Sequence, residues 1–162
     1  MGAVGFTTSI PIEVLLAAGK RPVDLNNAFI SAPEAHTFVR EAERGGFPST
    51  CCAWMRGIYG VLPTLDVDEV IAVVRGDCSQ TQALMEVLQM EGTPVYPFAY
   101  PYDRSPQAIG LEIGKLREHF GVRAEEVEEA KGRLDRIRRK LNRLDVLTWR
   151  DGLVSGGENH RF

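Results

Sequence analysis

The clearest pattern along the chain is an unbroken run of β-branched and small apolar residues at Val70–Val74. Such a run is typical of a strand that is buried on both faces of a parallel sheet. Shorter apolar runs at 4–7, 21–25 and 95–98 predict three further strands. The hydrophobic pattern therefore predicts four strands, of which the one near residue 70 is central.

Helical patterns lie between these runs, at residues 12–18, 34–45, 51–61 and 80–90. Proline before the first of them and glycines after the ends of three of them are typical helix boundaries. Alternating strands and helices indicate a parallel sheet with right-handed crossovers. We therefore expect an α/β fold of three layers, with a four-stranded parallel sheet in a flavodoxin-like arrangement.

The C-terminal third of the chain has a different pattern. Residues 106–120 and 124–147 predict a long helix pair, and the second helix carries an apolar stripe at spacings of three and four beside a densely charged face. We expect this stripe to pack on the α/β layer or on a partner. The stripe consists of Val127, Ala130, Leu134, Ile137, Leu141 and Leu144.

The residues after this helix pair predict only a strand or linker at 151–157, followed by an end without a capping signal. We divide the chain into a cysteine-bearing α/β domain at 1–105, a helical extension of it at 106–150, and a linker at 151–162. This linker would lead to a second domain that the chain does not contain, so we expect a fragment or an N-terminal subunit.

Composition narrows the class of protein. The chain has 162 residues, of which 44% are hydrophobic and 25% charged, as expected for one globular unit. Its net charge of −3 argues against a nucleic-acid partner. No apolar run reaches the ~20 residues of a membrane span, and no secretory signal is present. We expect a cytoplasmic protein, whose three cysteines are metal ligands, nucleophiles or buried residues rather than disulfide partners.

Cys78 follows the central strand in the loop Gly76-Asp77-Cys78-Ser79, directly before a helix. Ligands of open α/β sheets bind at the carboxyl ends of strands, and a helix N-terminus lowers the pKa of a thiol. Cys78 is thus a candidate ligand or nucleophile, or alternatively a small buried residue of a tight turn. Asp77 is a candidate hydrogen-bond acceptor for a ligand group, although a helix cap is the preferred interpretation.

Cys51 and Cys52 begin another predicted helix. Adjacent side chains point about 100° apart on a helix, so we expect one of them to be a ligand while the other packs. Arg56 lies one turn after Cys52 and could donate a charge-assisted hydrogen bond to a thiolate or a cluster sulfide, or could simply be a surface residue. No zinc spacing, nucleotide-binding glycine motif or phosphate-binding loop is present.

Four polar residues are candidates for the wall of a substrate pocket. Thr8, Ser9 and Glu13 belong to the first strand-to-helix loop, and Tyr100 follows the fourth strand. Alternatively, Ser9 is a helix cap, Glu13 a residue of the first helical turn and Tyr100 a packing aromatic.

Six segments taken together resemble the 2-hydroxyacyl-CoA dehydratase and benzoyl-CoA reductase superfamily. The resemblance is to the N-terminal domain of proteins such as the 2-hydroxyglutaryl-CoA dehydratase D-component. The sequence around Asp24-Leu25-Asn26-Asn27 and Gly76-Asp77-Cys78 is most similar to the branch that includes the double-cubane cluster proteins. The segments are 5–14, 17–27, 52–60, 76–79, 97–101 and 156–160.

This resemblance implies an oxygen-sensitive iron–sulfur protein with two α/β domains per subunit. Cysteines at strand ends would hold a [4Fe-4S] cluster or a double-cubane cluster. An ATP-dependent iron–sulfur activator would deliver a low-potential electron, which would drive dehydration of a 2-hydroxyacyl-CoA through a ketyl radical or another difficult reduction.

By position, the resemblance makes Cys52 the first cluster ligand and Cys78 the second, with Cys51 as an alternate ligand. The remaining cluster cysteine of the family lies in the second domain, and no cysteine follows Cys78 here. We therefore expect half of an iron–sulfur dehydratase-like protein, in an oligomer completed by a second domain or subunit of the same family.

Two other hypotheses stay open. The chain could be a cluster-free α/β binding or scaffold domain that acts through its long charged helix. It could also be a thiol enzyme with Cys78 as nucleophile, although His36, His119 and His160 are scattered and none is placed by sequence as its base.

Overall fold

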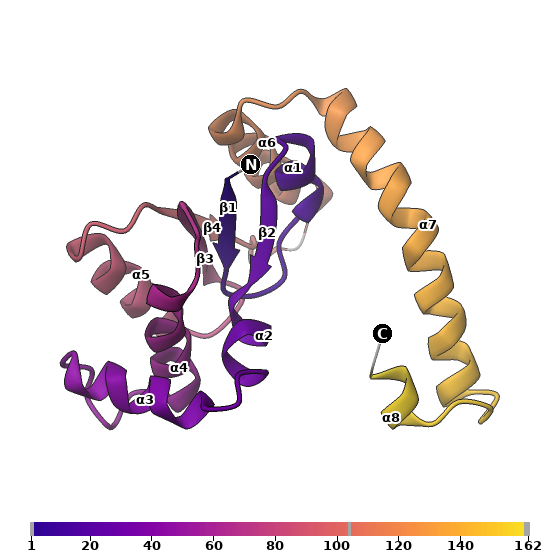
Figure 1. The fold of residues 1–162 in the computed structure, drawn as a ribbon. Helices are drawn as coiled ribbons and strands as arrows, with labels where there is room; N and C mark the ends of the chain where they lie inside the picture. The colour runs from indigo at the N-terminus through magenta and orange to yellow at the C-terminus, as the bar shows by residue number, and fades with distance from the viewer. Residues whose placement is uncertain (1, 104, 161–162) are drawn as a thin grey trace.

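The computed structural model describes residues 2–103 and 105–160. It contains a four-stranded sheet in the order β2-β1-β3-β4, in which every pair of neighbours is parallel. Figure 1 shows this sheet with helices on both sides. The predicted α/β fold with its parallel sheet is confirmed. The strands are β1 (Ala3–Phe6), β2 (Arg21–Asp24), β3 (Glu69–Arg75) and β4 (Val95–Ala99).

Alternate residues of β3 enter two different cores, one on each face of the sheet. Ile71 and Val73 pack with residues of α1 and α6, whereas Val70 packs with residues of α2, α4 and α5. Because all three are fully buried, β3 is the central strand that its unbroken apolar run predicts. The helices are α1 (Ile12–Ala17), α2 (Leu25–Ile30), α3 (Ala35–Arg44), α4 (Ala53–Val61), α5 (Gln80–Met90) and α6 (Pro106–Phe120), with a 3-10 turn at Leu62–Thr64.

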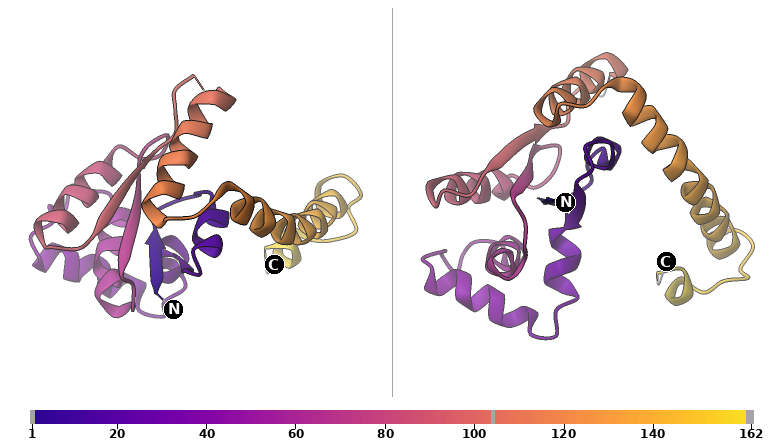
Figure 2. Two further views of the ribbon diagram at one scale, coloured as in Figure 1. Left: turned by 90° about the horizontal axis from the view of Figure 1, so that it is seen from above. Right: turned by 45° about the horizontal axis from the view of Figure 1, so that its top comes forward.

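A long helix, α7 (Ala124–Trp149), leaves this layered body as an arm, and a short helix, α8 (Gly156–Asn159), folds back against the arm's end. Figures 1 and 2 show the arm standing apart from the sheet in every view. The first half of the apolar stripe packs on α1, and Ala130 is fully buried. In the second half Ile137 is 55% exposed. The stripe was predicted to pack on the α/β layer or on a partner, and its first half packs on the α/β layer.

The structure corrects three boundaries. The second strand ends at Asp24, whose side chain accepts hydrogen bonds from the first backbone N–H groups of α2, a helix that the sequence pattern did not predict. The helix with the adjacent cysteines begins at Ala53, so Cys52 is its N-cap. The segment predicted as a strand or linker at 151–157 contains the start of α8, where Ser155 and Glu158 form a capping box.

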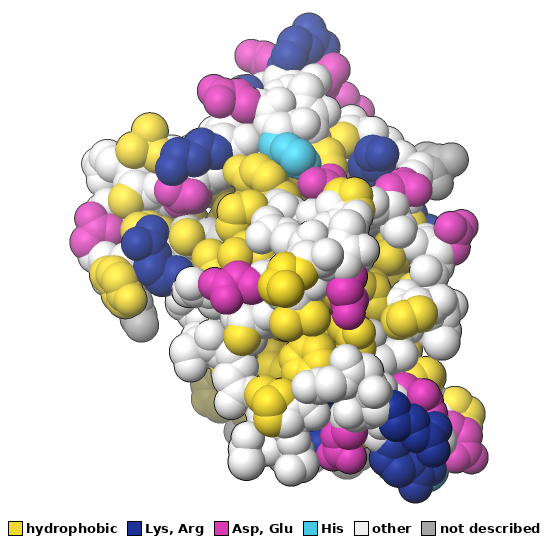
Figure 3. Space-filling view, turned by 90° about the vertical axis from the view of Figure 1, so that its left-hand side faces the viewer, with side chains coloured by type: hydrophobic (Ala, Val, Ile, Leu, Met, Phe, Trp, Pro, Cys, Tyr) yellow, Lys and Arg dark blue, Asp and Glu magenta, His cyan; other side chains and the backbone are white. Residues whose placement is uncertain are grey.

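The surface on the side of α5 shows hydrophobic side chains gathered in a central band, with charged side chains around it (Figure 3). Among the helices of the described residues, none combines the length and the apolar character needed to cross a bilayer.

Candidate functional site

A cavity of about 320 Å³ lies where β1 and β3 end, and it is lined by two of the three cysteines. The chain turns from β1 outward to β2, while β3 continues on the other side of β1. The carboxyl ends of β1 and β3 therefore flank the point where the strand order reverses, which is where open α/β sheets bind ligands. We call this cavity the cysteine pocket. Its lining is Thr7, Thr8, Asn26, Cys52, Trp54, Met55, Asp77 and Cys78.

Cys78 reaches the pocket on a constrained turn between β3 and α5. Gly76 has a φ of +92°, and a Cβ on it would lie 2.6 Å from the Cβ of Tyr100, so only glycine fits there. Cys78 is exposed, and Asp77 lines the pocket beside it. The expectation that Asp77 caps α5 is wrong, because the N-cap is Ser79 and α5 has no side-chain cap.

Cys52 reaches the same pocket from the opposite wall, as the N-cap of α4. Its backbone N–H donates a 2.8 Å hydrogen bond to Oε1 of Gln80, the first residue of α5. Next to Cys52, the Trp54 indole donates a 2.6 Å bond to Oδ1 of Asn26, whose Nδ2 donates a 2.7 Å bond to the carbonyl of Thr7. This chain of bonds joins α4 and α2 to the end of β1, so the pocket wall is built from three elements.

Cys51 lines a different cavity of about 270 Å³, together with residues of the α3–α4 loop and of α5. Its carbonyl accepts a 3.1 Å hydrogen bond from Nε of Arg56. Arg56 is buried, and its Nη1 is paired with Glu43 of α3. The described hydrogen bonds of Arg56 thus hold the backbone before Cys52 rather than a thiol.

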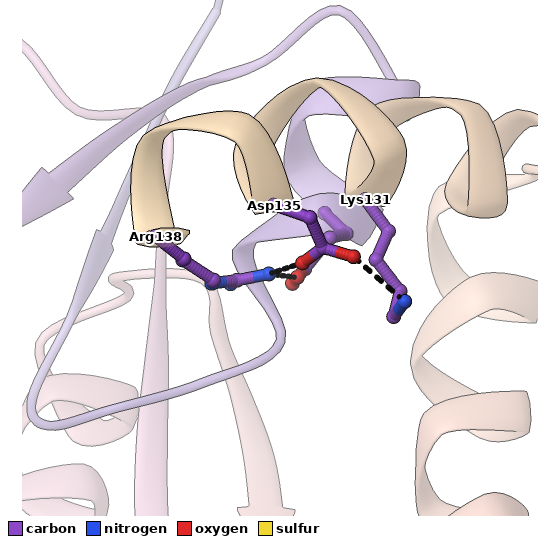
Figure 4. Close-up of polar contacts among 4 residues, drawn as sticks. Lys131, Asp135 and Arg138 are labelled. Atoms are coloured by element: carbon purple, nitrogen blue, oxygen red, sulfur yellow. Dashed lines mark hydrogen bonds and ion pairs between the residues drawn. The ribbon is translucent and has the colours of Figure 1, made fainter. Parts of the chain in front are cut away.

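Of the four proposed substrate-contacting residues, only Thr8 lines the cysteine pocket. Glu13 is buried and lies 2.6 Å from Arg138 of α7. Asp135 lies 3.1 Å from the same guanidinium and 2.9 Å from Nζ of Lys131 (Figure 4). Glu13 therefore ties α1 to the arm, and its buried carboxylate is paired with Arg138.

Tyr100 belongs to a second, larger cavity on the other side of the Gly76 turn, whereas Ser9 lines neither cavity and meets Tyr100 only through its backbone carbonyl. Tyr100 lines this cavity of about 600 Å³ with aromatic and aliphatic neighbours, and burial raises the pKa of its phenol. Its hydroxyl donates a 2.7 Å hydrogen bond to the carbonyl of Ser9. Because Gly76 lines this cavity while Asp77 and Cys78 line the cysteine pocket, a single loop separates the two.

The cysteine pocket offers two thiols, and a metal centre needs more. Among the residues that the structure describes, no three His, Cys, Asp or Glu side chains form a group able to hold a metal ion. Cys52 and Cys78 supply two thiols to this pocket, whereas an iron–sulfur cluster usually has four protein ligands. Among the described residues that line the pocket there is no histidine to act as a base for a catalytic thiol.

Sequence reasoning missed Asn26, Trp54 and Gln80. The signals were present but weak: Asn26 follows a strand end, and Gln80 lies two residues after Cys78. Their contacts join residues 19 and 28 positions apart, which no local pattern reveals.

Comparison with known proteins identifies one family. The family model described as 2-hydroxyglutaryl-CoA dehydratase, D-component, matches residues 7–156. The match therefore includes the cysteine pocket, the larger cavity and the arm. No curated protein matches the chain.

Proposed function

The chain belongs to the 2-hydroxyglutaryl-CoA dehydratase D-component family, and we propose that it supplies half of the iron–sulfur cluster site of a dehydratase-like protein. In this proposal Cys52 and Cys78 are the two ligands from this chain, and Cys51 is not a ligand. The cluster is a [4Fe-4S] centre or one cube of a double-cubane cluster.

One observation carries the proposal. Cys52 and Cys78 come from elements 26 residues apart in the sequence, and both line one cavity at the reversal point of the sheet. Exposed thiols at such a point suit a ligand that enters from outside the domain. Cys51, by contrast, lines a cavity between α5 and the α3–α4 loop.

The residues of the chain have distinct roles in this proposal. Cys52 and Cys78 bind the cluster through their thiolates. Asp77 accepts a hydrogen bond from a group in the pocket, and Trp54 shields one wall from water. A bound cluster would supply single-electron chemistry at low potential. Its remaining ligands come from a second domain or subunit of the same family, or from water or a small ligand.

The larger cavity beside Tyr100 is our proposed place for the acyl group of an acyl-CoA substrate. Its walls are mainly aromatic and aliphatic, which suits an apolar acyl chain. The low-potential electron would come from an ATP-dependent iron–sulfur activator, and the proposed setting is the cytoplasm.

The test is anaerobic reconstitution with iron and sulfide, with Cys51→Ser as the matched control. We expect the protein to gain a brown colour and the broad absorbance of a [4Fe-4S] cluster. Cys52→Ser and Cys78→Ser should each lose most of the bound iron, whereas Cys51→Ser should keep it. A colourless wild type, even with its family partner present, would refute the proposal. Loss of iron in Cys51→Ser alone would refute the choice of Cys52.

A second candidate function is a cluster-free scaffold that acts through the arm. The observation in its favour is that Ile137 and Trp149 of α7 are 55% and 73% exposed, although they are large apolar side chains. Exposed apolar side chains on an extended element are a feature of association surfaces. If this is the main function, the double variant Ile137→Asp/Trp149→Ser abolishes oligomers in size-exclusion chromatography, while Cys52→Ser and Cys78→Ser change nothing.

A further inference from the structure

One side chain, Gln80, ties the two cysteine-bearing segments together. Its Oε1 accepts the 2.8 Å hydrogen bond from the Cys52 backbone N–H, and Cys78 lies two residues before it in the chain. We infer that Gln80 is a positioning residue that directs the Cys52 thiol toward the Cys78 thiol. This inference rests on the two-thiol site proposed above, and it explains why Cys52 rather than its neighbour faces the pocket.

The bond fills a position that the local sequence leaves empty. In a capping box, the third residue of a helix accepts a hydrogen bond from the backbone N–H of the N-cap. Glu126 of α7 and Glu158 of α8 do so at 2.8 and 2.9 Å. The third residue of α4 is Met55, whose thioether is only a weak acceptor. Gln80 takes this role from a neighbouring helix, so the cap of α4 depends on α5.

The same peptide group is held at its other end. The Cys51 carbonyl and the Cys52 N–H belong to one planar unit, in which they point in opposite directions. The carbonyl accepts from Arg56 at 3.1 Å while the N–H donates to Gln80 at 2.8 Å. Anchoring both ends restrains the plane of this peptide, and each of the two adjacent cysteine side chains is oriented relative to this plane by a single backbone torsion.

Gln80 itself stands on a fixed base. The next residue, Thr81, is fully buried, and its hydroxyl donates to the Met55 sulfur at 3.8 Å. The first turn of α5 is thus packed against the first turn of α4. The hydrogen bond to Gln80 restrains Cys52 relative to Cys78, because Cys52 is then held by the first residue of α5 and Cys78 lies two residues before that residue.

Two restrained thiols should chelate a soft metal ion better than two loose ones. We therefore propose titration of the reduced protein with Cd²⁺ alone, followed through thiolate-to-metal absorbance. Gln80→Ala should weaken Cd²⁺ binding by roughly fivefold, the worth of one ordinary hydrogen bond. Gln80→Glu keeps an acceptor oxygen and should restore most of the affinity. Gln82→Ala is the matched control, because Gln82 lies on the same helix and bonds only Glu86 among the described contacts.

A double-mutant cycle separates positioning from a general structural effect. In the Cys78→Ser background a single thiol has no partner to be aligned with, so Gln80→Ala should leave the residual Cd²⁺ affinity unchanged. An equal loss in both backgrounds would overturn the inference, because Gln80 would then act through stability or charge.

The exchange rate of the Cys52 amide hydrogen, measured by NMR in the metal-free protein, tests the hydrogen bond without any metal. Gln80→Ala should accelerate this exchange, and Gln82→Ala should not. If wild type binds Cd²⁺ no better than Cys52→Ser and Cys78→Ser, the proposed two-thiol site is refuted. The amide exchange rate still tests, independently of any metal, whether Gln80 holds the Cys52 backbone. An exchange rate that is the same in wild type and Gln80→Ala overturns the inference.

Discussion

Gly60 allows α4, the helix that presents Cys52, to lie closely against α3, and its replacement should test how tightly the site is supported. A Cβ built on Gly60 would lie 2.7 Å from the carbonyl carbon of Phe38 and 2.8 Å from its Cα. Real Cβ atoms do not approach so closely, and the obstacle is backbone rather than a mobile side chain. The substitution Gly60→Ala must therefore push α3 and α4 apart.

The expected cost follows from two opposing terms. Overpacking of a close contact costs about 1–3 kcal/mol, and the upper end applies here because backbone atoms must move. Alanine is about 1 kcal/mol better than glycine within a helix, which offsets part of this cost. The net loss in the free energy of unfolding should be about 2 kcal/mol, which corresponds to a melting temperature lower by about 4–8 °C.

Urea denaturation of wild type, Gly60→Ala and the control Gly114→Ala measures these terms separately. Gly114 lies within α6, and a Cβ there would meet nothing within 4 Å. Gly114→Ala should therefore gain about 1 kcal/mol from helix propensity alone. If Gly60→Ala were as stable as wild type, or gained as much as the control, the close approach of α3 and α4 would be refuted.

Three further predictions concern single interactions. Asp24→Ala should lower the free energy of unfolding by about 1 kcal/mol because it removes the cap of α2, and Asp24→Asn should recover most of this loss in urea denaturation. The Tyr59 hydroxyl donates to Glu91 at 2.6 Å, and this bond, with burial and the nearby negative charge, raises the pKa of Tyr59 from 10.0 to about 12. The folded protein thus holds the phenol proton more tightly than the unfolded chain does. The stability that this bond contributes is therefore present below pH 10 and lost as the pH rises from 10 to about 12. Melting temperatures of Tyr59→Phe, measured against pH, should lack this loss. Glu13→Gln should loosen the arm, seen as faster amide exchange where Arg138 meets α1, while leaving cluster reconstitution unchanged.

The sheet could be predicted because its signals are local. β3 is buried on both faces, so every position from 70 to 73 had to be apolar, and an uninterrupted run of this kind has few other interpretations. The six-residue helix α2 was missed because it is too short to show a helical period, and its start depends on the side chain of Asp24. Likewise α8 spans only Gly156–Asn159, and its capping box was the one local sign of a helix.

The candidate site was predictable where chain order alone fixes geometry. Cys78 follows the central strand, so its place at the carboxyl edge of the sheet follows from the parallel topology. The choice between Cys51 and Cys52 had no such basis, because it depends on a peptide group held by Arg56 and by Gln80. Arg56 was expected to reach a thiol from one turn away, but its guanidinium turns back to a carbonyl and is paired with α3.

The turn after β3 connects the two halves of the proposed chemistry. Gly76 lines the larger cavity and the next two residues line the cysteine pocket, so a group in one cavity is separated from the other by the width of a single backbone loop. The positive φ of Gly76 and the close approach of Tyr100 leave no room for a side chain at this point of the loop. An electron-transfer dehydratase requires its donor and its substrate to be neighbours, and a single loop between the cavities would keep that separation short. For this reason the thiols, rather than the substrate residues, are where the proposal is tested first: if Cys52 and Cys78 do not bind together, the larger cavity has no electron donor beside it.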